Sequence, residues 1–197
     1  MYKLGITGGI GSGKTTAANF FRKMGAIVFD ADVEAKNHLQ NTISLQHQII
    51  SAFGNKVTTN NKLDLKKLAE AAFATTIDQK ILNGLIWPEI YLIKEKALSK
   101  AVNLDKKLFV VDAALLLEAD SLDFYDKTLL ITAEKPIRLH RATLRKNISV
   151  QQIKKRMALQ MAESEKRKLV DFTIENDNSI GELIKNLEKF YKSLKLG

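Results

Sequence analysis

A cluster of glycines near the N-terminus constrains the fold of this chain more than any other feature. Residues 5–13, GITGGIGSG, contain five glycines, and Lys14, Thr15 and Thr16 follow them. Glycine loses more conformational entropy on folding than other residues, so a cluster is expected where the backbone turns sharply or approaches a ligand closely. Residues 8–15 fit the pattern G-x-x-x-x-G-K-[ST], with an apolar stretch before them and an amphipathic helical pattern after them. This order predicts a strand, a phosphate-binding loop and a helix.

The loop residues also predict how a nucleoside triphosphate is held. The backbone N–H groups of a glycine-rich turn point at a phosphate, and side chains at several of these positions would block its approach. Lys14 is expected to reach the β- and γ-phosphates, and the Thr15 hydroxyl to coordinate Mg²⁺. The alternative, a glycine-rich turn with an incidental lysine, accounts less well for the complete motif. The predicted nucleotide-binding residues of the loop are Gly8, Gly9, Ile10, Gly11, Ser12, Gly13, Lys14, Thr15 and Thr16.

Short apolar stretches alternate with helical patterns along the chain. This alternation predicts the α/β class, with a parallel five-stranded sheet covered by helices on both faces. Residues 33–105 are helical in pattern and lie between the second and third expected strands, so we expect an inserted helical subdomain whose last helix is interrupted near Pro88. The expected strands are residues 2–6, 26–30, 107–113, 128–132 and 171–176.

Carboxylates follow two of these strands at their carboxyl ends, where a parallel sheet binds its ligand. Asp30 and Asp32 follow the second strand, and we expect Asp32 to orient a substrate hydroxyl and to accept its proton. The alternative is that Asp32 only caps the next helix. Asp112 follows the apolar residues LFVV and is expected to hold Mg²⁺ directly or through water, with a strand-end turn as the alternative. Glu118 is a weaker candidate for the same edge.

The cationic side chains are concentrated in one segment. Residues 135–168 contain 11 of the 31 Lys and Arg residues and only 2 of the 22 Asp and Glu residues, so this segment holds the whole formal net charge of +9. Such a block predicts phosphates or nucleic acid as its partner, and a solvated helix face is the alternative. The segment lacks the interleaved aromatic residues on which bases stack. Two helices are expected, over 135–146 and over 149–162, the second opened by a capping box of Ser149 and Gln152. Joined by a short turn, they predict a lid that would bring arginines over the transferring phosphoryl group; these are Arg138, Arg141, Arg145 and Arg156.

Composition excludes several classes of protein. The chain has no cysteine, which excludes disulfides and thiolate metal sites and fits a reducing compartment. Its N-terminus has no signal-peptide pattern, and no apolar run approaches the ~20 residues of a membrane span. We therefore expect a cytoplasmic protein with no membrane partner, which is a monomer or a weak homo-oligomer.

In this order, these residues resemble the dephospho-coenzyme A kinase family over essentially the whole chain. The resemblance implies a P-loop NTPase kinase fold and transfer of the γ-phosphoryl group of ATP, with Mg²⁺, to the ribose 3′-hydroxyl of dephospho-CoA. It also implies a helical CoA-binding subdomain after the DAD sequence and a mobile lid over about residues 136–168, with no nucleic-acid partner. The stretches that carry it are TGGIGSGKTT (7–16), VFDADVEAK (28–36), LIWPEI (85–90), VVDAALLLE (110–118), RLHRATLRK (138–146), RMALQ (156–160) and EKRKLVDFTIEN (165–176).

The resemblance also implies roles for individual residues. Asp32 matches the family's base or hydroxyl-orienting acid, and Lys14 and Arg141 complete the expected catalytic set. Arg141 and Arg145 match lid arginines that approach ATP, and Asn176 matches a residue near the adenine pocket. The expected metal ligands are Thr15 and Asp112, and the expected substrate-binding residues are Asp32, Lys36, Trp87, Leu115, Leu116 and Glu118.

Three positions on the acceptor side depart from the family's usual pattern. Trp87 stands where the family usually has histidine before proline, and Ala114 stands where it has proline before two leucines. Lys36 replaces an arginine, and lysine cannot reproduce a bidentate guanidinium contact. These departures keep a nucleoside or nucleotide kinase as an alternative. The cationic segment keeps a second one, a nucleotide-dependent nucleic-acid-binding protein.

Overall fold

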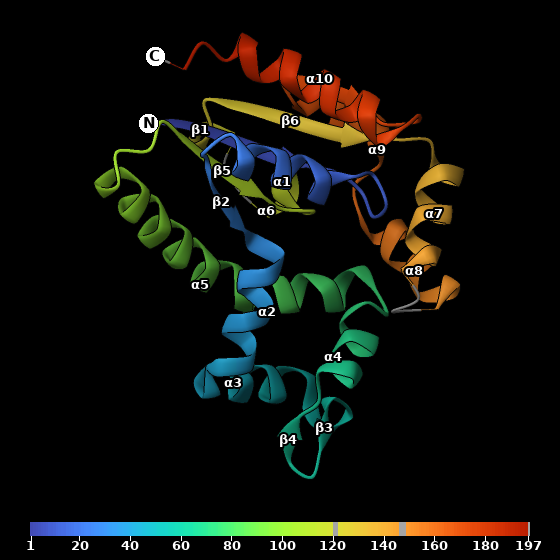
Figure 1. Cartoon of the computed structure of the whole chain (residues 1–197). Helices are drawn as coiled ribbons and strands as arrows, with labels where there is room; N and C mark the ends of the chain where they lie inside the picture. Colours follow the sequence, from blue (N-terminus) through green and yellow to red (C-terminus); the bar gives the residue numbers. More distant parts are fainter. Residues whose placement is uncertain (120–121, 146–148, 197) are drawn as a thin grey trace. The chain divides into compact units, whose positions relative to one another are not determined.

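The computed structural model describes residues 1–119, 122–145 and 149–196 of the chain. It divides into two compact units, of which the first is formed by Met1–Asp30 with Lys96–Gly197 and the second by Ala31–Glu95 (Figure 1). The expected insertion over residues 33–105 extends further than the second unit, because its last helix continues into the first.

The first unit is an α/β unit with one parallel sheet. Its described helices are α1 (Lys14–Lys23), α6 (Leu116–Ala119), α7 (Lys135–Leu144), α8 (Val150–Leu159), α9 (Glu163–Leu169) and α10 (Ile180–Ser193), with a 3₁₀ turn at Leu122–Phe124. Its strands are β1 (Tyr2–Thr7), β2 (Ile27–Asp30), β5 (Leu108–Asp112), β6 (Lys127–Thr132) and β7 (Phe172–Glu175).

The strands pair in the order β2-β5-β1-β6-β7, and every pair is parallel (Figure 1). This confirms the expected five-stranded parallel sheet. Asp112 of β5 lies level with Ile6 of β1 on one side and with Asp30 of β2 on the other. The register therefore brings the end of β5 beside the start of the glycine-rich loop.

Helices cover both faces of this sheet. Alternate residues of a strand point to opposite faces, so each strand packs against helices on both sides. Leu4 and Ile6 of β1 belong to a buried cluster with Phe21 of α1 and Leu187 of α10. Gly5, between them, faces the other way, where a side chain on it would meet Leu116 of α6. The strands are thus buried on both sides, which explains why they appear in the sequence as continuous apolar runs.

The cationic segment differs from the two helices that the sequence predicts. It forms three helices, α7, α8 and α9, because Gln160 is extended (ψ 149°) and residues 160–162 separate α8 from α9. The capping box of Ser149 and Gln152 is confirmed. The predicted end of the first helix at residue 146 and the turn after it lie outside the described residues.

The second unit is built from helices and one short hairpin. The side chains of Leu45, Ile49, Val57 and Leu68 are buried in it. The predicted interruption at Pro88 is wrong, because α5 continues through this residue although a proline has no N–H group to donate. No helix among the described residues is long and apolar enough to cross a membrane. The elements of this unit are α2 (Ala31–Asn41), α3 (Ile43–Phe53), a 3₁₀ turn (Gly54–Val57), β3 (Thr58–Thr59), β4 (Lys62–Leu63), α4 (Leu65–Ala72) and most of α5 (Thr76–Asn103).

Candidate nucleotide-binding site

The glycine-rich loop connects β1 to α1 and has the backbone conformation that the motif predicts. Gly11 (φ 81°) and Gly13 (φ 101°) adopt left-handed conformations that glycine reaches without steric cost. The N–H group of Ser12 donates to the carbonyl of Gly9 (3.0 Å), which closes the turn. Helix α1 begins at Lys14, and the first amides of a helix have no acceptor within it. The loop therefore leads into a helix N-terminus that attracts an anion.

Lys14 and Asp112 form an ion pair at the mouth of this loop, between Lys14 Nζ and Asp112 Oδ1. The side chain of Asp112 is 1% exposed and that of Lys14 is 13% exposed. A buried carboxylate requires such a compensating charge. The structure thus places the predicted phosphate-binding cation and the predicted metal-binding acid in contact, although 97 residues lie between them in the sequence.

Asn176 fastens the loop to the end of β7. Its side-chain Nδ2 donates to the Ser12 carbonyl (2.8 Å), and its backbone N–H donates to the Thr132 carbonyl (2.7 Å). Arg141 Nη1 donates to the Asn176 carbonyl (2.6 Å), and its Nη2 donates to the Asn178 carbonyl (3.1 Å). Asn176 Oδ1 is buried and has no hydrogen-bond partner among the described residues, so it is an acceptor beside the loop. The structure brings together three of the predicted nucleotide-binding positions, which lie far apart in sequence.

The segment that follows Asp112 is held by a buried lysine that the sequence did not single out. Lys166 of α9 is fully buried, and its Nζ donates to the Ala114 carbonyl (3.0 Å) and lies 3.6 Å from Glu118 Oε1. Burial lowers the pKa of Lys166, and the neighbouring Glu118 and Glu163 carboxylates oppose that shift. Glu118 Oε1 also accepts from the Met161 N–H (3.0 Å). In this structure Glu118 therefore ties the segment after β5 to α9.

The two leucines of this segment differ in exposure. Leu115 is half-buried, whereas Leu116 is 1% exposed and packs on the sheet beside Gly5. Any contribution of Leu116 to substrate binding would therefore act through packing, and the substrate-binding roles of Leu115, Leu116 and Glu118 stay predictions.

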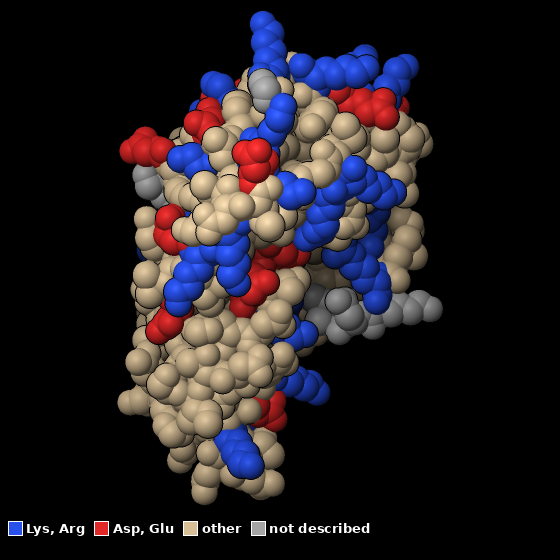
Figure 2. Space-filling model, turned by 60° about the vertical axis from the view of Figure 1, so that its left-hand side comes forward, with Lys and Arg blue, Asp and Glu red and all other residues tan. Residues whose placement is uncertain are grey.

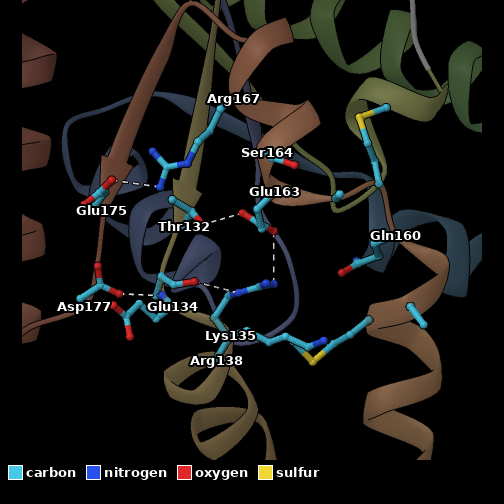
Figure 3. A pocket seen from close by; sticks show the side chains of 15 residues that line it. Thr132, Glu134, Lys135, Arg138, Gln160, Glu163, Ser164, Arg167, Glu175 and Asp177 are labelled. Carbon is cyan, nitrogen blue, oxygen red and sulfur yellow. Dashed lines mark hydrogen bonds and ion pairs between the residues drawn. The ribbon is translucent and has the colours of Figure 1, made fainter.

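A cavity of about 700 Å³ lies between α7, α8 and α9 (Figure 3). On its wall, Arg138 Nη1 is 3.2 Å from Glu163 Oε1, and Thr132 Oγ1 donates to the other oxygen of Glu163. Gln160, on the same wall, accepts a hydrogen bond from the Ile10 N–H of the glycine-rich loop (3.3 Å). The sequence placed Arg138 among the lid arginines, but the structure has it 7% exposed.

Several cations of the segment 135–168 are engaged within the protein. Besides Lys166, Arg167 pairs with Glu175 (2.9 Å) and Lys168 pairs with Glu165 (2.9 Å). Burial lowers the pKa of Arg156, and Arg145 is exposed just beyond the end of α7. Figure 2, which turns the left-hand side of Figure 1 forward, shows lysine and arginine atoms beside aspartate and glutamate atoms on that face.

Three predicted residues belong to the second unit. Asp32 is exposed in the first turn of α2, which begins at Ala31, so it is not the residue that caps this helix. Lys36 is exposed one turn further along α2, and Trp87 is half-buried in α5. Their roles stay predictions.

Comparison with known proteins identifies the family. The family model described as dephospho-CoA kinase matches residues 2–182. A dephospho-CoA kinase of Salinibacter ruber is 35% identical over 192 residues, which cover 97% of this chain and 96% of the relative. The chain belongs to the dephospho-CoA kinase family. The sequence-based resemblance is thereby confirmed.

Solved structures agree with this family and with the P-loop kinase fold. A Thermus thermophilus protein superimposes with a TM-score of 0.81 at 29% identity, covering 98% of both chains. The dephospho-CoA kinase of Campylobacter jejuni gives a TM-score of 0.66 at 27% identity, covering 98% of this chain and 96% of its own. A shikimate kinase of Acinetobacter baumannii, at 14% identity with a TM-score of 0.53 and 100% and 96% coverage, shares the fold alone. This dephospho-CoA kinase family member thus has the P-loop kinase fold that the glycine motif predicted.

Proposed function

We propose that this chain transfers the γ-phosphoryl group of ATP to the ribose 3′-hydroxyl of dephospho-CoA, which completes coenzyme A. The observation that carries the proposal is the family match over residues 2–182. The glycine-rich loop with its Lys14–Asp112 pair supplies the matching chemistry, because a buried cation and a helix N-terminus both stabilise phosphate.

Lys14 and Asp112 change partners in the proposed mechanism. ATP phosphate oxygens replace Asp112 as the acceptors for Lys14 Nζ, and Asp112 then becomes available to a cation. The residues fit Mg²⁺, because the Thr15 hydroxyl and the Asp112 carboxylate are oxygen donors. Among the described residues, no group of three or more His, Asp or Glu side chains is placed to hold a metal ion. Mg²⁺ usually keeps several waters and takes one or two carboxylates and substrate phosphates as its other ligands. When bound, Mg²⁺ neutralises negative charge on the phosphates.

Asp32 is the proposed base. The 3′-hydroxyl oxygen attacks the γ-phosphorus while the bond to the β–γ bridging oxygen breaks, ADP leaves, and the hydroxyl proton passes to the Asp32 carboxylate. Arg141 and Arg145 would stabilise the charge on the transferring group. In this structure the Arg141 guanidinium donates to the backbone carbonyls of Asn176 and Asn178. The segment of about residues 136–168 is the proposed lid, and its exposed part would move while the buried side chains of Arg138 and Lys166 stay in place. Residues 33–105 are the proposed acceptor-binding region, including Lys36 and Trp87.

A direct test measures ADP and CoA formation from MgATP with purified protein. The acceptors are dephospho-CoA, a panel of nucleosides and nucleotides, and no acceptor. We expect ADP only with dephospho-CoA, in equal amount to CoA. Turnover of a nucleoside in place of dephospho-CoA would contradict the proposal and would favour the alternative kinase that Lys36, Trp87 and Ala114 suggest.

The role of Asp32 has a matched control in the same helical turn. Asp32→Asn and Glu34→Gln each remove one carboxylate from the first turn of α2. We expect Asp32→Asn to lower kcat by about 10²- to 10⁴-fold and to leave the Kd for ATP unchanged, because only the base is lost. Glu34→Gln should keep full activity. Equal activity of the two variants would rule out Asp32 as the base.

The ion pairs of the cationic segment argue against the nucleic-acid alternative. Arg138, Arg167 and Lys168 each pair with a glutamate, which reduces the charge available to a polyanion. A gel-shift titration against salt tests this directly: submicromolar affinity with a steep salt slope would favour nucleic acid. The proposed monomer or weak homo-oligomer is testable by light scattering, and the cytoplasmic location stays a prediction.

A further inference from the structure

Three residues that line the cavity in Figure 3 also lie against the glycine-rich loop. We call this set, Arg138, Gln160 and Glu163, the loop shelf. A Cβ atom added to Gly9 would collide with Arg138 Nη1 and would lie 2.7 Å from Glu163 Oε1. A side chain built on Gly11 would collide with the backbone carbonyl of Arg138.

Gln160 completes the support between these two glycines. Its Oε1 accepts from the Ile10 N–H at 3.3 Å, so the shelf contacts the three consecutive residues Gly9, Ile10 and Gly11. These residues precede Ser12, Gly13 and Lys14 and set the direction in which the backbone enters the helix. A rotation of one peptide plane here would turn the following amides away from a phosphate.

The shelf is itself rigidly held. Arg138 Nε donates to the Ala133 carbonyl (3.0 Å), and its Nη1 lies 3.2 Å from Glu163 Oε1. Thr132 Oγ1 donates to the second oxygen of Glu163, so both ends of the carboxylate are fixed. Arg138 is 7% exposed, and one charge-assisted hydrogen bond and one ion pair hold its guanidinium group in place.

We propose that Arg138 and Gln160 are positioning residues for the ATP phosphates: the loop shelf sets the shape of residues 9–11 and thereby the affinity for nucleotide. The inference rests on the proposed function in that it assumes ATP as the donor. It concerns the nucleotide alone, so dephospho-CoA binding should not respond to changes in the shelf.

The experiment compares Arg138→Met, Gln160→Met and the control Arg167→Met. Arg167 lines the same cavity and also pairs with a glutamate, but its pair joins α9 to β7. The measurements are the Kd for ADP by calorimetry, the KM values for ATP and dephospho-CoA, kcat, and the melting temperature without nucleotide. Binding of ADP to the wild-type protein is measured first, because its absence would refute the proposed function and not the shelf.

We expect Arg138→Met to raise the Kd for ADP and the KM for ATP by about 10- to 100-fold, since a buried charge-assisted network is lost. Gln160→Met loses one neutral hydrogen bond and should raise both by about 3- to 10-fold. The KM for dephospho-CoA should stay within about twofold for both, and Arg167→Met should resemble wild type in all nucleotide measurements. A purely structural role would lower only the melting temperature. If Arg138→Met does not fold, Gln160→Met alone decides, and unchanged ADP affinity in it overturns the proposal.

A variant of Glu163 distinguishes two possible roles of Arg138: positioning of the loop, and direct attraction of the phosphates by the Arg138 charge. Glu163→Gln removes the negative charge but can keep hydrogen bonds to both Arg138 and Thr132. If the shelf only positions the loop, ADP affinity should stay within about twofold of wild type. A tenfold gain in affinity would mean that the uncompensated guanidinium attracts phosphate directly, and would overturn the positioning role. Arg138→Lys should rescue part of the loss seen in Arg138→Met, because it keeps the pair with Glu163.

Discussion

Replacing Lys14 with methionine should destabilise the nucleotide-free protein as well as abolish phosphate binding. The replacement keeps most of the length of the side chain and removes the charge that faces Asp112, whose side chain is 1% exposed. Breaking a buried ion pair by removing one partner costs about 3–5 kcal/mol. Because the Lys14 side chain is 13% exposed, solvent reduces this cost, and we expect about 2–4 kcal/mol. For a chain of this length that corresponds to a fall of roughly 4–16 °C in Tm.

A double-mutant cycle isolates the pair from the other effects of the substitution. Asp112→Asn removes the opposite charge, and the double variant Lys14→Met/Asp112→Asn leaves neither charge buried alone. We expect the double variant to be more stable than the sum of the single losses predicts, with a coupling energy of about 1–3 kcal/mol. Lys23→Met is the control, since Lys23 is an exposed lysine of the same helix.

The assay is denaturant unfolding without nucleotide, repeated with saturating ADP. Wild type should gain stability from ADP by mass action, and Lys14→Met should gain almost none. The reasoning is refuted if Lys14→Met loses no more stability than Lys23→Met, or if the losses of the single variants add in the double variant. Either result would mean that the buried contact between Lys14 and Asp112 contributes no net interaction energy.

Three further substitutions test other parts of the structure. Burial raises the pKa of Asp171, but hydrogen bonds from Lys127 and Thr128 outweigh burial and lower the pKa below 3.8. The stability that Asp171 contributes at neutral pH should therefore be lost as the pH falls through that lowered pKa. Asp171→Asn should remove this acid-sensitive part of the profile of Tm against pH. Burial lowers the pKa of Lys166 below 10.5, so in alkaline solution the unfolded chain binds more protons than the folded one. The stability of the wild-type protein relative to Lys166→Met should therefore rise as the pH increases toward 10.5. Thermal unfolding in alkaline buffers measures this rise. Pro88→Ala restores an N–H inside α5 and should stabilise the protein by about 1–3 kcal/mol, read as a higher Tm with unchanged circular dichroism.

The features that the sequence predicted are those set by neighbouring residues. The glycine motif determines the loop because conformational freedom is needed at Gly11 and Gly13 themselves. Strands buried on both faces are continuous apolar runs, and the capping box of Ser149 and Gln152 lies within four residues. The family resemblance was equally accessible, because it rests on short stretches in a fixed order.

The features that the sequence missed depend on contacts between distant residues. Arg138 shares its charge and spacing with Arg141, so the sequence grouped both as lid arginines, yet Arg138 is buried against Glu163 and Arg141 contacts backbone carbonyls near the loop. Lys166 is one cation in the run EKRKL, and only the packing of α9 shows that it is fully buried. Helix α9 was missed because residues 160–162 carry no glycine or proline that would mark the break.

The position of β1 in the sheet explains why the nucleotide site depends on the second half of the chain. β1 lies between β5 and β6, so the loop that follows it meets residues from the ends of both neighbours and of β7. Asp112 supplies the partner of Lys14, Asn176 holds Ser12, and Gln160 holds Ile10. The motif in the first sixteen residues therefore specifies which backbone can bind phosphate, whereas the later residues fix that backbone in its binding shape. Since these contacts all span about 100 residues or more, the site forms only when the sheet is complete, and nucleotide affinity should report on folding of the whole first unit.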